Sequence, residues 1–373
     1  MKYLIFGPTS STGISEDTYT LLLTLLSLNN EVLIFSTTKD ENKLFKCTLE
    51  NHKLNFIFIS NEYFLDFLSA KYIVASVGAI PYAYAYCENY KNIFQNAIKK
   101  IAYVAVEAEL EHSLNKYLLN FDLILCNSCF MKNIIDKCTN NKVNTKVIYP
   151  HVNLNFKESF SEKLKNQILK QKYILAMADY KSRPKRKGFD IILKVFQRLS
   201  SEFKDLNFIL KTYEMPFEEE KRLRAKIRTK NFILINKKFN RNQILTLISN
   251  SNVYFSPHRT EGFGRIIAEA MGLGTLVCAS NYSGNLDYMN KSNSILINGK
   301  LIKIKSYEYT SISNDALWFE PELKDCLDKL RICIKMSYEN RQTLINNAKN
   351  NIKYKYNLQA AKTKIKSLLK YES

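Results

Sequence analysis

Short apolar runs alternate with longer stretches of helical periodicity along the whole chain. In the first half, seven runs rich in β-branched and aromatic residues are bounded by polar turns, which is typical of buried parallel strands. They cover residues 2–7, 31–37, 55–60, 72–78, 100–107, 123–127 and 146–150. Residues 16–30 have a broad apolar face, and Ser15 precedes them as a predicted N-cap. The pattern predicts a β/α/β series.

The alternation starts again after a polar, lysine-rich connection. Six further strands are predicted at residues 173–178, 207–212, 231–236, 253–257, 275–280 and 294–298, with helices that include 188–203 and 241–251. Two successive series predict an α/β protein with two doubly wound, Rossmann-like domains of parallel sheet. We expect an N-terminal domain at 1–152, a C-terminal domain at 153–352, and a C-terminal helix at 353–373 that packs back on the first domain.

The composition is that of a soluble globular protein, and no segment has the length and apolarity of a signal peptide or a membrane span. The eight cysteines are scattered through apolar surroundings, and only Cys126 and Cys129 have a spacing found in metal sites. No second pair or histidine cluster joins them, so reduced thiols are the better interpretation. We therefore expect a cytoplasmic protein.

The formal net charge of +20 is unevenly distributed. Residues 1–150 hold 14 Lys and Arg against 14 Asp and Glu, whereas residues 151–373 hold 41 against 21. Such an excess favours an anionic partner: nucleic acid, an anionic membrane or a phosphorylated substrate. Whatever the anion is, the second half of the chain is expected to bind most of it.

The stretch "SPHRTEGFGRIIAEAMGLG" predicts a strand end, a glycine-rich turn and a helix that glycine terminates. Glu261 lies in the turn, where Gly262 and Gly264 let the backbone approach a ligand closely. The amides at the start of the following helix attract a phosphate or a sugar oxygen. Glu269 lies in the second turn of that helix. For the two glutamates taken alone, an ordinary helix with an acidic N-terminus is the more common explanation.

The whole string resembles the motif of retaining glycosyltransferases of the GT-B fold, family 4, in which Glu-Gly-Phe-Gly precedes a helix containing Glu-Ala. Here these are Glu261 to Gly264 and Glu269-Ala270. The segments "ILAMADYKSRPKRKGFDIIL" and "ISNSNVYFSPHRTEGFG" resemble the strand, basic loop and helix of the same family. In the first half, "FGPTSSTGIS" and "FDLILCNSCFMKNII" resemble it more loosely.

The resemblance implies a GT-B architecture of two facing domains with the ligand in the cleft, acceptor on the first and nucleotide sugar on the second. It implies retaining transfer of a sugar from a nucleotide-diphosphate sugar, such as a UDP- or GDP-sugar, to a hydroxyl of a glycan, lipid or protein acceptor, in glycan biosynthesis. It assigns catalytic roles to Glu261, which contacts the sugar, and to Arg183 and Lys187, which hold the diphosphate. The implied donor-binding residues are Gly262, Phe263, Gly264, Glu269 for the ribose, and Gly13 near the diphosphate.

No Asp-X-Asp sequence, the usual ligand of a catalytic divalent ion in metal-dependent transferases, occurs in the chain. Arg183, Lys187 and the helix start after Gly264 supply positive charge for the departing diphosphate instead. The sequence therefore predicts metal-independent transfer with no cofactor. A solvated loop or a nucleic-acid patch is the alternative interpretation of "KSRPKRK".

The acceptor side departs from the family, because no histidine follows a strand of the first domain as one does in many members. Glu107 and His112 are the acceptor-side candidates, and a solvated helix start explains them equally well. Two alternatives would explain the positive charge: a glycosyltransferase that modifies nucleic acid, and a non-catalytic nucleic-acid-binding protein. The neutral first half argues against both, since it is the expected acceptor domain. Peripheral contact of the second domain with an anionic membrane stays open.

Overall fold

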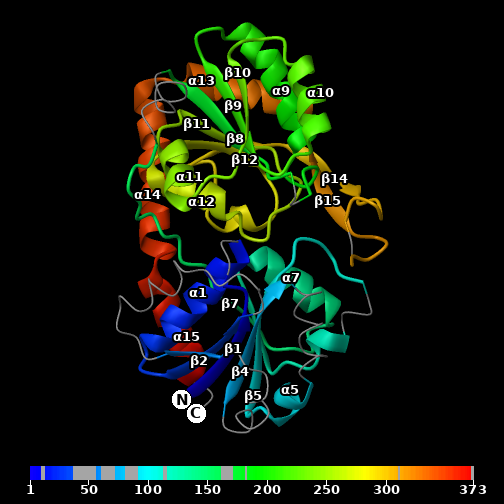
Figure 1. Ribbon diagram of the computed structural model, residues 1–373, viewed down its shortest axis with the longest axis vertical. Coiled ribbons are helices and arrows are strands. Elements are labelled where there is room, and N and C mark those ends of the chain that lie inside the picture. The colour runs from blue at the N-terminus through cyan, green and yellow to red at the C-terminus, as the bar shows by residue number, and fades with distance from the viewer. Residues whose placement is uncertain are drawn as a thin grey trace. The chain divides into compact units, whose positions relative to one another are not determined.

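The chain forms two compact units in the computed structural model (Figure 1). Unit 1 comprises Met1–His151, Ser311–Ala316 and Lys355–Ser373, and unit 2 comprises Val152–Thr310 and Leu317–Tyr354. The structure describes residues 1–9, 13–36, 56–59, 72–79, 91–111, 116–160, 171–180, 183–309 and 311–370. None of the helices in these described residues has the length and hydrophobicity of a transmembrane span.

Unit 1 is built on a parallel sheet with the strand order β3-β2-β1-β4-β5-β6-β7. The strands are β1 (Lys2–Gly7), β2 (Glu31–Ser36), β3 (Phe56–Ile59), β4 (Ile73–Ala79), β5 (Lys99–Ala105), β6 (Leu123–Cys126) and β7 (Thr145–Val147). The order reverses between β1 and β4, which is the topological switch point of a doubly wound sheet.

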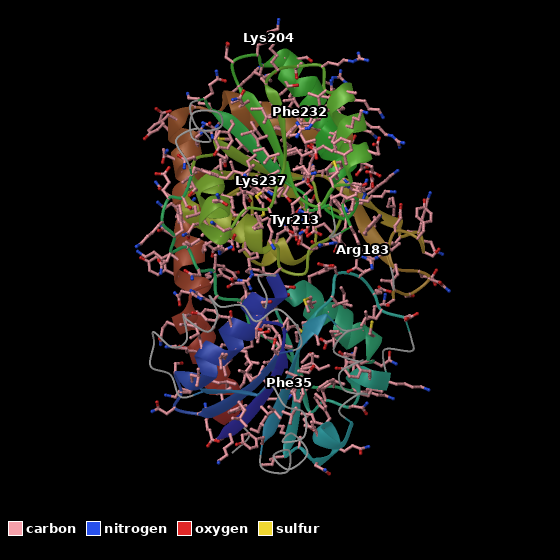
Figure 2. All side chains as sticks on the ribbon, viewed as in Figure 1. Phe35, Arg183, Lys204, Tyr213, Phe232 and Lys237 are labelled. Atoms are coloured by element: carbon pink, nitrogen blue, oxygen red, sulfur yellow. The ribbon has the colours of Figure 1, made fainter. Side chains whose placement is uncertain are left out.

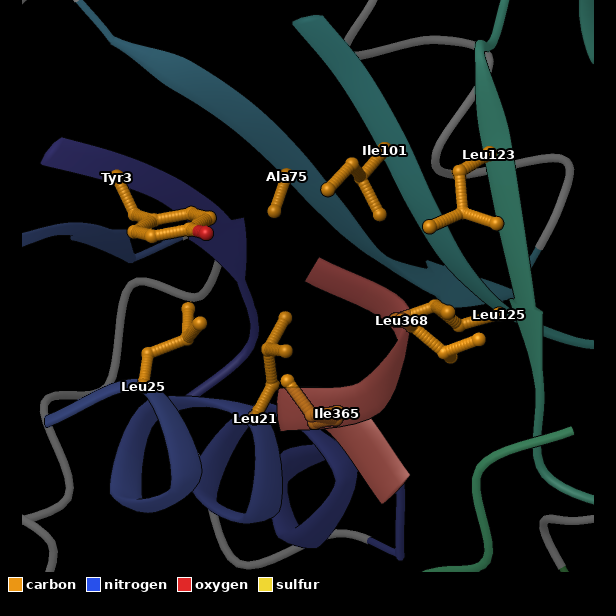
Figure 3. A pocket seen from close by; sticks show the side chains of 9 residues that line it. All are labelled: Tyr3, Leu21, Leu25, Ala75, Ile101, Leu123, Leu125, Ile365 and Leu368. Atoms are coloured by element: carbon orange, nitrogen blue, oxygen red, sulfur yellow. The ribbon is translucent and has the colours of Figure 1, made fainter. Parts of the chain in front are cut away.

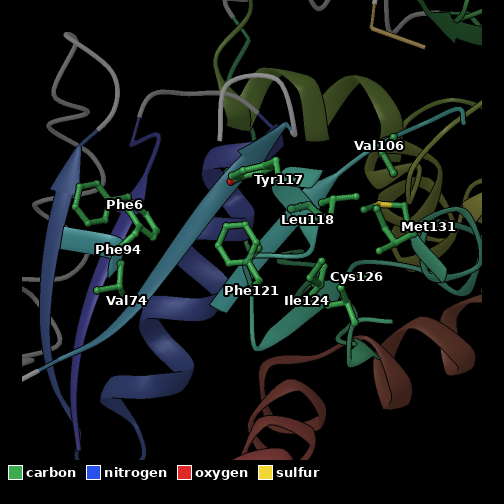
Figure 4. Packing of buried hydrophobic residues seen from close by; sticks show 14 of the residues in the cluster. Phe6, Val74, Phe94, Val106, Tyr117, Leu118, Phe121, Ile124, Cys126 and Met131 are labelled. Carbon is green, nitrogen blue, oxygen red and sulfur yellow. The ribbon is translucent and has the colours of Figure 1, made fainter. Parts of the chain in front are cut away.

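Helices cover both faces of this sheet: α1 (Gly13–Leu26), α5 (Lys91–Asn96), α7 (Cys129–Cys138) and α15 (Leu358–Lys370). On one face α15 packs against α1, and apolar side chains of both helices meet the sheet around a small apolar cavity (Figure 3). On the other face a second core gathers α5, α7 and aromatic rings such as Phe94 and Phe121 (Figure 4). The C-terminal helix therefore completes the core of unit 1.

Unit 2 repeats the pattern in a six-stranded parallel sheet with the order β10-β9-β8-β11-β12-β13. Its strands are β8 (Tyr173–Met177), β9 (Asn207–Thr212), β10 (Phe232–Asn236), β11 (Val253–Ser256), β12 (Leu276–Ser280) and β13 (Ile295–Ile297). Its helices are α9 (Phe189–Glu202), α10 (Phe217–Lys226), α11 (Arg241–Ser249), α12 (Arg265–Leu273), η3 (Gly284–Asp287), α13 (Leu323–Lys335) and α14 (Tyr338–Lys355). The switch point of unit 2 lies between β8 and β11.

An antiparallel hairpin interrupts this regular pattern between β13 and α13. It consists of β14 (Gly299–Lys303) and β15 (Leu317–Pro321) and stands outside the main sheet. The hydrophobic pattern does not predict it, because β14 is mostly exposed and only its Leu301 and Ile302, between two lysines, are apolar.

All thirteen predicted strands are present, with ends within three residues of the prediction. The predicted N-cap Ser15 is wrong, because α1 already begins at Gly13 and Ser15 lies in its first turn. The two series thus form the predicted α/β fold, with a switch point in each sheet where ligands bind in such folds.

Candidate functional site

The loops that follow β8 and β11 meet at the switch point of unit 2. Gly188 at the end of the β8 loop has φ +72°, and a Cβ there would lie 2.0 Å from the carbonyl oxygen of Pro257, just after β11. The backbone N–H of Arg259 donates to the carbonyl of Arg186 at 2.7 Å. These contacts bring the basic loop, residues 183–187, against the turn that contains Glu261.

Glu261 is buried, with 7% of its surface exposed. Its carboxylate accepts a hydrogen bond from the Lys187 ammonium, and its other oxygen lies 3.5 Å from Nη1 of Arg186. Burial alone would raise the pKa of the Glu261 carboxyl, but the charges of Lys187 and Arg186 outweigh it and hold the pKa at about 2. Glu261 is therefore a carboxylate held between two cations.

The backbone of Glu261 is fixed by the segment after β12. Its N–H donates to the Ser283 hydroxyl at 2.9 Å, and its carbonyl accepts from the N–H of Gly284 at 3.0 Å. Ser283 in turn contacts Asn285, which lies 3.0 Å from Nε2 of the fully buried His258. Burial lowers the pKa of His258, so this histidine is a neutral structural partner. This network fixes Glu261 through its backbone, and the carboxylate contacts Lys187 and Arg186 instead.

The turn after Glu261 leads directly into α12. Gly264 has φ +79° and a Cβ there would lie 2.8 Å from the Tyr288 hydroxyl, so the position needs glycine. That hydroxyl donates to the carbonyls of Phe263 and Gly264, and the Phe263 ring packs on Tyr288. The turn is thereby rigid, and the N-terminus of α12 with its partial positive charge lies beside Glu261.

Glu269, in the second turn of α12, is fully buried and paired with Arg241, whose Nη1 lies 2.7 Å from Oε1. Arg241 opens α11 and also donates to the carbonyl of Asn153 at 3.0 Å. The two glutamates of the motif are thus both buried and both paired with cations, but with different ones. The sequence does not reveal this pairing, because Arg241 precedes Glu269 by 28 residues.

The predicted cation pair, Arg183 and Lys187, is divided in the structure. Lys187 contacts Glu261, whereas the guanidinium of Arg183 stacks 4.4 Å over the ring of Tyr309. Arg186, which the sequence analysis did not select, is the second cation at Glu261. In the sequence, Arg186 is recognisable only as one member of a run of basic residues. Because residues 184–188 form a tight turn, both Arg186 and Lys187 reach one carboxylate.

The unit 1 candidates are less closely defined. Gly13 is the first residue of α1, which follows β1 at the switch point of that sheet. Glu107 lies half-buried just after β5, and nearby Glu109 pairs with Lys137. His112 lies outside the described residues. In the part of the chain that the structure describes, no group of three His, Cys, Asp or Glu side chains is placed to hold a metal ion.

Comparisons with known proteins identify a matching family and a matching fold. The profile of the family described as "Glycosyl transferases group 1" matches residues 160–351, just over half of the chain. No curated protein sequence matches significantly.

Solved structures match over essentially the whole chain. HepE of Anabaena, in complex with UDP and glucose, is 16% identical with a TM-score of 0.71 and 100% coverage of both chains. A glycosyltransferase of Rickettsia africae is 17% identical with a TM-score of 0.70, covering 99% of this chain and 98% of its own. An α,α-trehalose-phosphate synthase of Burkholderia xenovorans is 9% identical with a TM-score of 0.69, covering 99% and 100%. Such likeness confirms the predicted fold class.

Proposed function

Because the chain belongs to the glycosyl transferases group 1 family and is a glycosyltransferase, we propose that it moves a sugar from a nucleotide-diphosphate sugar to an acceptor hydroxyl. The observation that carries this proposal is the pairing of Glu261 with Lys187 and Arg186 at the switch point of unit 2. Two cations around one carboxylate leave a net positive charge in a buried place, which suits a diphosphate.

Lys187, Arg186 and the N-terminus of α12 are proposed to bind the diphosphate, with Arg183 as a further cation of the same loop. Glu261 is proposed to accept hydrogen bonds from the sugar hydroxyls, and Gly262 to Gly264 to let the donor approach the backbone closely. The structure of Anabaena HepE described as a complex with UDP-glucose supports a donor of this class.

We further propose that the reaction retains the configuration of the sugar. The bond between the anomeric carbon and the β-phosphate oxygen breaks, and the acceptor oxygen bonds to that carbon from the same face. The acceptor's proton passes to the leaving diphosphate. Glu261 is not the nucleophile in this scheme, because the two cations that hold its pKa at about 2 reduce the basicity of its carboxylate.

Transfer is proposed to need no metal ion. Lys187 and Arg186 supply the positive charge that a divalent ion supplies elsewhere, and the chain contains no Asp-X-Asp sequence. We expect full turnover with EDTA present, measured as release of free nucleoside diphosphate. Activity lost in EDTA and restored by manganese or magnesium would contradict this part of the proposal.

The acceptor is proposed to bind to unit 1, where Glu107 is the acceptor-side candidate that the structure describes, while Gly13 is proposed to lie near the diphosphate. Equal numbers of basic and acidic residues in positions 1–150 favour a glycan, lipid or protein hydroxyl over a nucleic acid. The excess positive charge of residues 151–373 is compatible with peripheral contact of that part with an anionic membrane.

The two glutamates of the motif provide the test. Glu261→Gln keeps the shape of the side chain, so binding of bare nucleoside diphosphate should persist while turnover falls about 100-fold or more. Glu269→Gln should weaken nucleoside diphosphate itself by about 10- to 100-fold, because the proposed ribose contact exists with or without the sugar.

Calorimetric titration of both variants, beside a turnover assay, separates the outcomes. Full turnover in Glu261→Gln would remove this residue from the site. A Glu269→Gln protein that melts at a lower temperature yet binds nucleoside diphosphate normally would show that Glu269 only holds Arg241 and does not contact ribose.

A further inference from the structure

Lys211, at the carboxyl end of β9, is a buried lysine whose ammonium is incompletely satisfied. Only 3% of its surface is exposed. Within the described residues its one hydrogen bond goes to the carbonyl of Thr212 at 2.8 Å. The ring of Phe239 lies 4.9 Å from Nζ, and that of Tyr213 lies 5.6 Å from it. An ammonium has three N–H groups, so two of them have no described hydrogen-bond acceptor.

Such a group is costly to keep in a folded protein. Burial lowers the pKa of Lys211 to about 8, against a smaller opposing influence of Asp179. An apolar side chain of similar volume would stabilise the fold at least as well as this lysine, because burying an unpaired charge is unfavourable. The residue is therefore a candidate for a ligand contact.

The order of strands places Lys211 on a defined side of the proposed phosphate site. Residues 183–187 follow β8, and Glu261 follows β11, so phosphate and sugar lie at the β8–β11 boundary. The β12 side of this boundary is filled, since Gly284 has no room for a Cβ against the carbonyl of Gly262. The nucleoside is then directed toward the opposite side, where β9 and β10 end.

Lys211 lies at that edge. Neighbouring strands are about 4.8 Å apart, so the end of β9 is one strand spacing from β8, within reach of a nucleoside attached to the diphosphate. Lys211 is paired in register with Met177 of β8 on one side and Ile235 of β10 on the other. Figure 2 shows Tyr213 and Lys237 at this end of the sheet, with Phe232 nearer the other end.

We propose that Lys211 reads the nucleobase of the donor by donating a hydrogen bond to a carbonyl oxygen of the base, with Phe239 as an aromatic neighbour against which the base packs. The proposal rests on the proposed function and names its donor class: nucleotides whose base carries a carbonyl, such as uracil or guanine. Adenine has no carbonyl oxygen. Lys211 is therefore a specificity-determining residue, because adenine offers its ammonium no carbonyl oxygen at the position that uracil or guanine would fill.

The test is calorimetric titration of the full chain with UDP, GDP and ADP. The wild-type protein should bind UDP or GDP about 10- to 100-fold more tightly than ADP, as expected for a hydrogen bond to a charged group. In Lys211→Met the affinity for the preferred nucleotide should fall to that for ADP, and the affinity for ADP should stay unchanged. The melting temperature should stay equal or rise, because a buried charge is removed.

Lys237→Met is the matched control, since Lys237 is an exposed lysine just after β10. It should keep the base preference. Equal wild-type affinity for all three nucleotides, or a preference that survives in Lys211→Met, would overturn the role of Lys211 and leave the proposed function intact. Absence of binding to any of the three by the wild-type protein would instead contradict the proposed function itself.

Discussion

Unit 2 contains two clusters of charge, each centred on a buried side chain, that are similar in composition and differ in how fully their polar groups are paired. One centres on Arg259, which is 1% exposed and makes five hydrogen bonds: two to Asp190, two to Glu320 and one to the carbonyl of Lys185. These use every N–H of the guanidinium. The other centres on Glu261, which is held by Lys187 and Arg186.

The charge left over separates the two clusters. One cation between two carboxylates leaves a net negative charge at Arg259, with each donor paired. Two cations around one carboxylate leave a net positive charge at Glu261, in surroundings where water screens little. A fully paired cluster stabilises the fold, whereas an excess of buried positive charge favours binding of an anion. Burial of an ion pair alone therefore does not distinguish a structural cluster from a functional one.

The largest effect is expected from breaking the Arg259 cluster. Arg259→Met leaves Asp190 and Glu320 without their shared partner, and because 42% and 30% of these two side chains are exposed, the cost is about 2–3 kcal/mol, below that of a fully buried pair. The free energy of unfolding should fall by that amount in urea titrations at neutral pH. The cation also packs 5.5 Å over the Trp318 ring, so packing is lost as well.

Arg331→Met is the matched control for this prediction. Arg331 pairs with Glu202 and Asp328 near the surface, where ion pairs contribute roughly 0–1 kcal/mol. If both variants lose the same small amount of stability, the Arg259 cluster has no special structural role.

A smaller effect is expected from the Glu261 cluster, and it should appear in binding. Lys187→Met removes a charged contact to the proposed diphosphate, so the affinity for nucleoside diphosphate should fall about 10- to 100-fold. Arg186→Met should weaken binding too. Its guanidinium also lies 3.3 Å from the carbonyl of Thr260 and is more deeply buried, so this variant should lose stability as well.

Lys185→Met serves as the control, because Lys185 belongs to the same loop but pairs with Glu308. Its effect on affinity should be less than about threefold, because Lys185 contacts Glu308 and not Glu261. Equal losses of affinity in Lys185→Met and Lys187→Met would mean that the loop acts through its total charge and that contact with Glu261 has no particular importance.

Some parts of the fold and of the site could be predicted from the sequence, and others could not. The strands were predictable because parallel strands buried on both faces read as continuous apolar runs, as in "KYLIFG" and "YILAM". Glu261 was predictable because the turn and the helix after it have a local signature. The roles of Arg186 and Arg183 could not be predicted, because the sequence shows only four basic residues within five positions. The direction of each side chain depends on the conformation of the turn.

A local sequence pattern also does not show which residues pair across long distances in the chain. Arg259 meets Glu320 across 61 residues, and β15, which carries Glu320, belongs to a hairpin with no clear alternation of apolar and polar positions. The hairpin is stabilised by pairing with itself and by burial of Trp318 and Phe319 against Arg259 and Tyr282, which come from distant loops of unit 2. The periodicity of apolar residues indicates which face of one helix or strand is buried. It does not indicate contacts between segments that are far apart in the sequence.

The hairpin contacts both the Arg259 cluster and the basic loop that carries Lys187 and Arg186, and this connection leads to the smallest expected effect. Glu320 at its base binds Arg259, while Glu308 and Tyr309 in the connection between its strands contact Lys185 and Arg183 of the basic loop. Glu308 is itself held, because its backbone N–H donates to the carbonyl of Lys305 at 2.8 Å and its carboxylate accepts from the N–H of Lys305 at 3.1 Å.

Arg183 has φ +60°, a conformation that costs a residue with a side chain about 1 kcal/mol, so its surroundings must favour it. The Tyr309 ring supplies a cation–π contact of about 0.5–1 kcal/mol. Tyr309→Leu should therefore weaken nucleoside diphosphate binding about two- to fivefold and raise the KM for the donor, with kcat little changed. Tyr309→Phe keeps the ring and should bind like the wild type. If Phe and Leu behave alike in calorimetric titration, the ring does not position Arg183, and the hairpin acts on the fold only through Glu320.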